Sequence, residues 1–263
     1  MSGDWVLLER SGDVARLVGE LPDVDDVTLS GRRIVCPTRP TDRAIVLGSS
    51  QDAALVDAVR ASGAGSAVVR RRSGGGAVYV EPGAQVWIDV FVPAGDPLLV
   101  ADVGRSAWWL GELWADACAH VTGAGRGAYT VHRGGLVASP WSRVACFAGL
   151  GPGEVTVGGR KLVGISQRRD RRGAWLHSMA LARLDADGFA RQLALAPDDR
   201  AGLAGALASG VATLHADAPR PPASPGVTAG IAPLPGSRTS PGAAGSEAAL
   251  LGRVVEAFVA RLP

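Results

Sequence analysis

Three consecutive glycines, Gly74 to Gly76, constrain the fold of this chain more than any other stretch. They follow an apolar run that ends at Val69 and three arginines, and a second apolar run, residues 86–92, comes soon after them. This order predicts a strand, a glycine loop and another strand. Glycines permit positive φ and let a ligand lie directly on backbone N–H groups, and the arginines add positive charge beside those donors. A hairpin turn with a solvated basic edge is the alternative interpretation.

The glycine loop does not match the common nucleotide-binding loops. No Gly-x-x-x-x-Gly-Lys-Ser/Thr sequence occurs, and no helical pattern follows the glycines. A second glycine-rich stretch, residues 123–127, follows a predicted helix and leads into a predicted strand, which is the reverse of the order in a dinucleotide-binding turn. We therefore expect this second stretch to be a linker.

Residues 70–78 resemble the Arg-Arg-x-Ser-Gly-Gly-Gly-Ala-Val motif of the lipoate–protein ligase and octanoyltransferase superfamily, whose catalytic fold biotin–protein ligases share. Residues 161–167 are similar to its second signature, Lys-Val/Ile-x-Gly-x-Ala/Ser-Gln. The resemblance implies an α+β fold, a mixed β-sheet flanked by helices as in the biotin/lipoate–protein ligase catalytic fold. It also implies a set of acyl- or adenylate-binding residues, namely Arg71, Ser73, Gly74, Gly75, Gly76, Ala77, Gly164, Ser166 and His177.

Lys161 is the only lysine among the 27 basic residues of the chain. A codon bias toward arginine explains this composition, so a retained lysine indicates a position that needs a flexible primary amine. In the family that the chain resembles, this lysine faces the acyl carbonyl or the adenylate phosphate, where an ammonium stabilises developing negative charge. The alternative is an exposed hairpin lysine that has survived by chance.

Cys146 precedes Lys161 by 15 residues, within the sequence Ala-Cys-Phe. This segment resembles that of the cysteine-dependent octanoyl and lipoyl transferases, which implies that the thiol carries the acyl group. Because a thiol beside an ammonium loses its proton more readily, the expected catalytic pair is Cys146 and Lys161. The alternative is a buried structural cysteine in an apolar strand. Cys36 and Cys118 match no motif, and we expect both to be structural.

The resemblance implies an acyltransferase that moves an octanoyl or lipoyl group, through a thioester on Cys146, onto a lysine of a lipoyl carrier domain. The implied partners are the lipoyl domains of 2-oxoacid dehydrogenases, the glycine cleavage H protein or an acyl carrier protein. The basic group Arg168, Arg169, Arg171 and Arg172 is most simply a solvated turn, and docking of such an acidic partner is the alternative. Two alternatives stay open. One is an ATP-dependent lipoate–protein ligase that uses ATP and Mg²⁺ to form lipoyl-AMP, and the other is a family member that binds an acyl carrier without turnover.

Composition and length limit the remaining possibilities. A chain of 263 residues can bury one core, and we expect a catalytic domain over residues 1–215, a Pro/Gly/Ala-rich linker over 216–245 and a C-terminal helix over 246–263. The net charge of +2 argues against a nucleic-acid partner, and no apolar run reaches the roughly 18 residues that span a bilayer. The N-terminus does not resemble a signal peptide, and three scattered cysteines favour a reducing cytoplasm and no metal site.

Apolar periodicity and turn signals predict the order of the elements. We expect strands at residues 5–8, 44–48, 129–132, 154–157, 160–169 and 174–181, and helices at residues 14–21, 53–62, 101–121, 188–194, 198–209 and 247–262. Three tryptophans of the helix at 101–121, namely Trp108, Trp109 and Trp114, are predicted to pack in the core.

Overall fold

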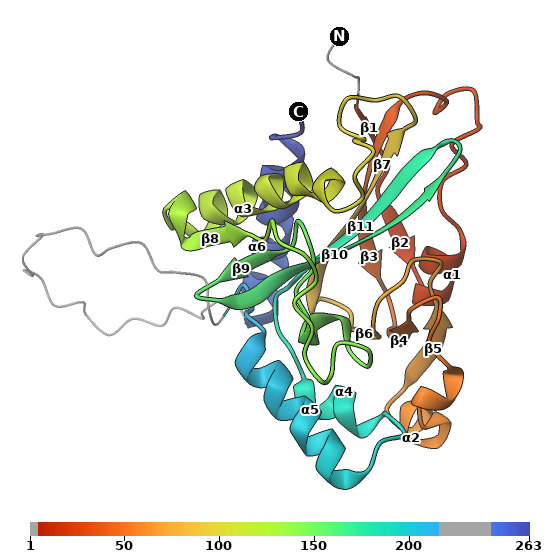
Figure 1. Ribbon diagram of the computed structural model, residues 1–263, viewed down its shortest axis with the longest axis vertical. Coiled ribbons are helices and arrows are strands. Elements are labelled where there is room, and N and C mark those ends of the chain that lie inside the picture. Colours follow the sequence, from red (N-terminus) through yellow and green to blue (C-terminus); the bar gives the residue numbers. More distant parts are fainter. Residues whose placement is uncertain (1–4, 216–242) are drawn as a thin grey trace, which may run out of the picture.

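The computed structural model describes residues 5–215 and 243–263. Its largest element is a mixed eight-stranded sheet with the order β1-β3-β7-β11-β10-β9-β8, in which β2 also pairs with β3 (Figure 1). These strands are β1 (Trp5–Leu7), β2 (Arg10–Gly12), β3 (Arg33–Pro40), β7 (Gln85–Pro93), β8 (Tyr129–Val131), β9 (Val155–Val157), β10 (Arg160–Asp170) and β11 (Gly173–Leu181). β1 and β2 run parallel to β3, and the other neighbouring strands are antiparallel.

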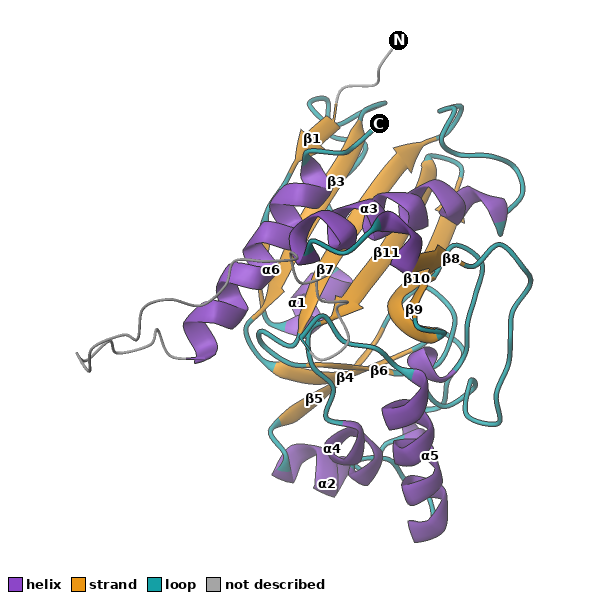
Figure 2. Ribbon diagram, turned by 90° about the vertical axis from the view of Figure 1, so that its left-hand side faces the viewer, coloured by secondary structure: helices purple, strands orange, loops and turns teal. Residues whose placement is uncertain are grey.

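A second, three-stranded sheet has the order β5-β4-β6, with β4 (Arg43–Leu47) between β5 (Ser66–Arg70) and β6 (Val78–Val80). Residues 71–77 join β5 to β6, so the predicted strand, glycine loop and strand are all present. Helices α2 (Ala58–Gly63), α4 (Ala186–Arg191) and α5 (Pro197–Gly210) lie beside this smaller sheet (Figure 2).

The central strand β7 shows how the sequence places the core and the cavity on opposite faces. Val86, Ile88 and Val90 belong to the main core, which α3 (Trp108–Thr122) and α6 (Ala243–Val259) cover. Because side chains alternate along a strand, the intervening Trp87 and Asp89 face the other way. Figure 2 shows α3 and α6 across one face of the large sheet, with α1 (Val14–Gly19) behind it.

The face opposite α3 and α6 is covered by α1 and the smaller sheet. Trp87 packs there with Val14 and Leu17 of α1 and with Val46 of β4. A further cluster, built from β4, α4 and α5, surrounds Phe147. These contacts confirm the expected mixed sheet flanked by helices, and they leave a space between the large sheet and the elements that cover it.

Several element boundaries differ from the prediction. The helix expected over residues 101–121 begins as a 3₁₀ turn at Arg105–Ala107 and continues as α3. The helix expected over residues 53–62 is divided into a 3₁₀ turn, Ala53–Leu55, and α2. The division has a tertiary cause, because Val56 forms a β-bridge with Leu193 and is therefore extended.

The sequence did not reveal β3, although it lies beside β7 in the sheet. Its two prolines, Pro37 and Pro40, argue against a strand because proline cannot donate to the ladder. The strand forms because its flanking residues pair with β7 on one side and with β1 and β2 on the other.

The tryptophan prediction is confirmed for Trp114, which is fully buried, whereas Trp108 and Trp109 are partly buried.

The C-terminal helix begins at Ala243, slightly earlier than expected, and packs against α3. Most of the linker expected over residues 216–245 lies outside the described residues. No helix in the described ranges has the length and apolar content needed to cross a membrane.

Candidate active site

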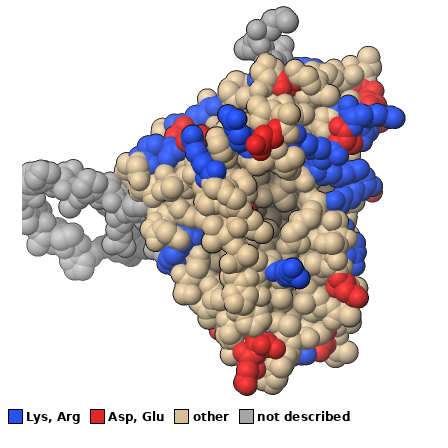
Figure 3. Space-filling view, in the orientation of Figure 1, with Lys and Arg blue, Asp and Glu red and all other residues tan. Residues whose placement is uncertain are grey.

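A mainly apolar cavity lies between the large sheet, α1 and the smaller sheet, and it contains about 730 Å³ of unfilled space including its open mouth. Figure 3 shows a hollow near the middle of this side of the molecule, with basic side chains on its right-hand side. The apolar walls come from α1 and from strands of both sheets: Leu17, Val18, Leu21, Val46, Val78, Val80, Trp87, Ile165 and Met179. The groups that can carry chemistry are Arg71, Arg72, Asp89, Cys146, Ser166 and His177.

Arg71 anchors the glycine loop from the inside. Its guanidinium donates to the carbonyls of Val46 at 3.1 Å, Gly74 at 2.7 Å and Gly76 at 2.8 Å. Burial lowers the pKa of Arg71 from its ordinary value, and the neighbouring Cys146 acts in the opposite direction. All of these contacts are to backbone dipoles, so the positive charge of Arg71 is available to an anion in the cavity.

The Cys146 segment is held directly against the glycine loop. Ala77 N–H donates to the Val144 carbonyl at 2.8 Å, and Cys146 N–H donates to the Ala77 carbonyl at 2.9 Å. A Cβ at Gly76 would lie 2.6 Å from the Ala145 carbonyl carbon and 2.7 Å from the Cys146 nitrogen, so this contact requires glycine. Gly75 has φ +97°, which also favours glycine.

The Cys146 thiol and the Arg71 guanidinium both lie near Gly75. A Cβ placed on Gly75 would lie 3.0 Å from Arg71 Nη2 and 3.9 Å from Cys146 Sγ. Cys146 begins a short 3₁₀ turn, Cys146–Ala148, and is partly exposed, unlike the fully buried Cys36 and Cys118. The apolar strand assumed by the alternative interpretation is therefore absent here, and Cys146 lines the cavity.

Lys161 is buried, so the alternative of an exposed hairpin lysine is not met. It is not among the residues that line the cavity, and its Nζ donates to the carbonyls of Cys146 at 2.8 Å and Gly149 at 2.9 Å. It also forms an ion pair of 2.7 Å with Glu154, and both side chains are 4% exposed. The expected direct contact between the Lys161 ammonium and the Cys146 thiol is missing, and the ammonium pairs with buried Glu154 instead. The sequence did not indicate this partner.

Glu154 has further contacts that fix this pair. Its carboxylate accepts from the N–H groups of Gly151 at 2.7 Å and Ile165 at 3.0 Å. Lys161 Nζ lies 4.9 Å from the centre of the Phe147 ring. Lys161 therefore holds the backbone of the Cys146 turn through its hydrogen bonds to the Cys146 and Gly149 carbonyls.

The other predicted site residues divide into two groups. Gly164, Ser166 and His177 line the cavity, as Arg71 does. The stretch from Ser73 to Ala77 does not line it and instead supports its wall. Ser73 is buried, and its hydroxyl lies 3.0 Å from that of Ser166, which ties the glycine loop to β10.

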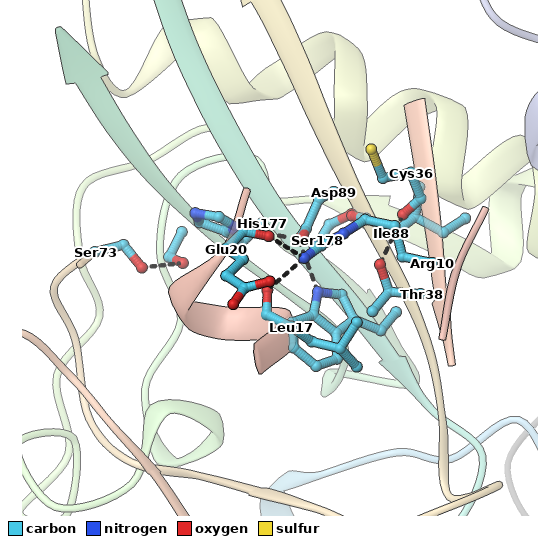
Figure 4. Close-up of polar contacts among 12 residues, drawn as sticks. Arg10, Leu17, Glu20, Cys36, Thr38, Ser73, Ile88, Asp89, His177 and Ser178 are labelled. Atoms are coloured by element: carbon cyan, nitrogen blue, oxygen red, sulfur yellow. Dashed lines mark hydrogen bonds and ion pairs between the residues drawn. The ribbon is translucent and has the colours of Figure 1, made fainter. Parts of the chain in front are cut away.

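Asp89 and Arg10 were not identified from the sequence as site residues. Asp89 is fully buried in β7, and its Oδ1 accepts from Trp87 Nε1 at 2.7 Å and lies 3.0 Å from His177 Nδ1. Its Oδ2 lies 3.7 Å from Arg10 Nη1 (Figure 4). A signal for Asp89 was available, because a carboxylate in the middle of a buried strand needs a partner. No group of three or more metal-ligating side chains occurs among the described residues.

Gln51, shortly after β4, connects two parts of the site. Its amide nitrogen donates to the carbonyls of Arg143 at 2.8 Å and Val144 at 3.1 Å, and its amide oxygen accepts from Gly48 N–H at 2.9 Å. Gln51 thus links β4 to the segment that carries Cys146.

Solved structures with a similar fold are lipoate-metabolism proteins. A bi-partite lipoate protein ligase from Thermoplasma acidophilum, studied with its E2 lipoyl domain, matches with a TM-score of 0.61 and 18% identity over 99% of this chain and 83% of that one. The T. acidophilum protein Ta0514 with bound lipoic acid matches with a TM-score of 0.55 and 20% identity, over 80% of this chain and 84% of that one. Lipoate-protein ligase A bound with ATP matches with a TM-score of 0.54 and 19% identity, over 80% of this chain and 76% of that one.

At these identities the structural matches show the fold alone, and no curated protein matches the chain significantly. The sequence itself matches the family model of the lipoyl protein ligase A/B catalytic domain over residues 30–225, which is most of the chain. That stretch includes the glycine loop, Cys146, Lys161 and His177. The chain therefore belongs to the lipoyl protein ligase A/B catalytic domain family.

Proposed function

We propose that this protein is an acyltransferase that moves an octanoyl or lipoyl group onto a lysine of a lipoyl carrier domain through a thioester on Cys146. The observation that supports this proposal most is the position of Cys146, a partly exposed thiol at an apolar cavity near the part-buried guanidinium of Arg71. A cation beside a thiol favours the thiolate, which is the nucleophilic form.

The proposed reaction has two steps. In the first, Cys146 Sγ attacks the carbonyl carbon of an acyl thioester on a carrier, the donor carbon–sulfur bond breaks, and the proton of Cys146 ends on the leaving thiol. In the second, a neutral lysine amine of the target domain attacks the carbonyl carbon of the Cys146 thioester, an amide bond forms, the carbon–sulfur bond to Cys146 breaks, and a proton of the amine ends on Cys146 Sγ. Each step places negative charge on a carbonyl oxygen, and Arg71 is the charged group positioned to stabilise it.

Lys161 has a different role in this proposal from the one that the sequence suggested. Its Nζ holds the carbonyls of Cys146 and Gly149, so it fixes the turn from which the thiol projects. We therefore assign Lys161 as a positioning residue for Cys146. The apolar walls from α1, β6 and β11 would exclude water from the acyl chain and hold its hydrocarbon part.

The carrier partner follows from the family and from the charge at the cavity. Arg72 lines the cavity, and basic side chains lie beside the hollow in Figure 3. Such a surface favours an acidic partner. A lipoyl domain is the proposed target, because the T. acidophilum ligase of similar fold was studied with its E2 lipoyl domain. The H protein and an acyl carrier protein are further candidates for acceptor and donor.

An assay with three donor conditions tests the proposal. The protein is mixed with octanoyl carrier protein, with free octanoate or lipoate alone, or with the free acid plus ATP and Mg²⁺, always with a lipoyl domain as acceptor. We expect transfer from the carrier without ATP, a mass increase of one acyl group on Cys146, and loss of both in Cys146→Ser. Transfer only from free acid with ATP, unchanged in Cys146→Ser, would instead identify an ATP-dependent ligase that forms lipoyl-AMP. Tight carrier binding without turnover would identify a carrier-binding protein.

A further inference from the structure

A second, smaller cavity adjoins the one that Cys146 lines. It contains about 280 Å³ of unfilled space and lies between β6, the end of β11, α4 and α5. Val78 and Phe147 line this cavity and also the larger cavity at Cys146. These two side chains therefore form a partition between the two spaces.

The Phe147 ring is held in this partition by its contacts with β10. A Cβ at Gly164 would lie 3.2 Å from Phe147 Cζ and 3.3 Å from Cε2, so the ring packs against the strand where it has no side chain. Lys161 Nζ lies 4.9 Å from the centre of the ring, and Phe147 is buried. The partition is therefore closed as long as Phe147 keeps this position.

The same ring also belongs to the buried cluster around the second cavity. It packs in that cluster with Leu181, Phe189 and Leu207, which line the second cavity and not the larger one. Apart from Tyr79, the residues that line the second cavity are apolar. Apolar cavities of this kind exclude water and take up hydrocarbon, so removal of the Phe147 ring would open a further space for an acyl chain.

We propose that Phe147, together with Val78, limits the length of the acyl group that this protein accepts. The inference rests on the proposed acyl transfer at Cys146. Phe147 follows Cys146 directly in the sequence, so an acyl group on the thiol begins beside the partition. An octanoyl or lipoyl chain lies along the apolar walls of the larger cavity, whereas the extra methylenes of a longer chain would have to displace the ring or stay in water. The protein therefore selects medium-chain acyl groups, and Phe147 is a specificity-determining residue.

Two acyl groups that differ in length test the proposal. Wild-type protein and Phe147→Ala are each incubated with octanoyl and dodecanoyl small-molecule thioesters, and acylation of Cys146 is followed by intact mass. The ratio of the two rates is compared, because a change next to Cys146 affects both rates. We expect Phe147→Ala to raise the dodecanoyl-to-octanoyl ratio at least about tenfold, since each methylene that leaves water strengthens binding severalfold. An unchanged ratio would overturn the assignment.

A milder substitution covers the case in which the alanine variant does not fold. Phe147→Leu keeps an apolar side chain in the partition but removes part of its volume, so the same ratio should rise by a smaller factor. Urea unfolding verifies that each variant is folded. A folded Phe147→Leu variant with the wild-type ratio counts against the proposal in the same way.

The matched control is Phe189→Ala, which makes the same chemical change on a wall that only the second cavity has. It enlarges that cavity behind an intact partition, so the ratio should stay within about twofold of the wild-type value. Adding Leu184→Phe to Phe147→Ala fills the second cavity and should return the ratio toward the wild-type value. An equal rise in Phe189→Ala and Phe147→Ala would show that general loosening of the core, and not the partition, controls chain length.

Equilibrium binding separates this inference from the proposed transfer. Cys146→Ser protein, with and without Phe147→Ala, is titrated calorimetrically with octanoate and dodecanoate, and the same shift toward dodecanoate is expected. If no thioester acylates Cys146 but the shift appears in binding, the proposed transfer fails and the length limit stands. If Cys146 is acylated but neither readout shifts in Phe147→Ala, the length limit fails and the proposed transfer stands.

Discussion

At the residue scale, the three cysteines differ because their surroundings differ. Burial, followed by the charge of Asp89, raises the pKa of the Cys36 thiol to about 12. Burial alone raises the pKa of Cys118 to about 12. Cys146 lies at the cavity and is partly exposed. The thiolate is the reactive form, so the two buried cysteines are protonated and inert at neutral pH.

This contrast predicts selective alkylation. Native protein treated with iodoacetamide near neutral pH should gain one adduct, at Cys146, located by peptide mass spectrometry. Cys36 and Cys118 should be modified only after denaturation, and native Cys146→Ser should gain no adduct. Modification of Cys36 in the folded protein would contradict the burial on which the assignment depends.

The Lys161–Glu154 pair predicts a stability effect that separates a positioning role from a direct catalytic one. Lys161→Met leaves the Glu154 carboxylate buried without a counter-charge, so the free energy of unfolding should fall by about 3–5 kcal/mol in urea denaturation. Lys161→Met combined with Glu154→Gln removes both charges and keeps an acceptor for one of the Gly151 and Ile165 N–H groups, which donate to different oxygens of Glu154. It should therefore be more stable than the single variant.

A small stability loss in Lys161→Met, below about 1 kcal/mol, together with complete loss of acyl transfer would count against the positioning role. That combination would support the direct role inferred from the sequence, in which the ammonium meets the acyl carbonyl. The two measurements on one variant therefore distinguish the interpretations.

At the element scale, the site depends on two loops that touch through their backbones. The glycine loop and the Cys146 segment exchange hydrogen bonds at Ala77, and Gly76 lies against Ala145 with no room for a side chain. Gly48, at the end of β4, has a similar contact, because a Cβ there would lie 1.9 Å from the Gly75 carbonyl oxygen. The glycines hold the loops close together, with Arg71 and Cys146 both near Gly75.

Two alanine substitutions in the same loop should therefore have opposite outcomes. Gly76→Ala should reduce acylation of Cys146 by at least about tenfold, because the new methyl displaces the backbone that positions the thiol. Gly74→Ala should change the rate by less than about twofold, since its Cβ meets nothing within 4 Å and its φ is not positive. Equal losses in both variants would show that glycine flexibility, and not close packing, is what the loop requires.

At the scale of the whole molecule, α6 completes the core on the face opposite the cavity. Phe258 is fully buried, and its ring lies 4.9 Å from that of Trp114 in α3. Trp114 in turn donates from Nε1 to Ser178 of β11 at 2.9 Å. Ser178 is next to His177 in β11. Through Trp114, the C-terminal helix therefore supports the strand that carries part of the site.

This packing predicts a large effect of one substitution in α6. Phe258→Ala should lower the free energy of unfolding by about 3–5 kcal/mol, because it removes a buried aromatic ring and leaves a cavity beside Trp114. Arg253→Ala, at an exposed position of the same helix, should change it by less than about 0.5 kcal/mol. Similar denaturation midpoints for the two variants would contradict the docking of α6 on α3.

The sequence by itself determined the family, the fold class and the order of most elements. Turn signals delimited β10 and β11, and the glycines placed the loop between β5 and β6, because these patterns express local backbone geometry. The position of β3 was hidden by its prolines, and the helix expected at residues 53–62 was divided by a bridge to Leu193. Both features depend on partners that are distant in the chain.

The tertiary structure decided which charged groups meet. Lys161 pairs with Glu154 and donates to the Cys146 carbonyl, whereas the cation near the Cys146 thiol is Arg71. Asp89, His177 and Arg10 come together only because β7 lies between β11 and β3 and because β2 pairs with β3. Local periodicity fixes which face of a strand a side chain takes, whereas an ion pair depends on which strands become neighbours, and that is settled by packing of the whole chain.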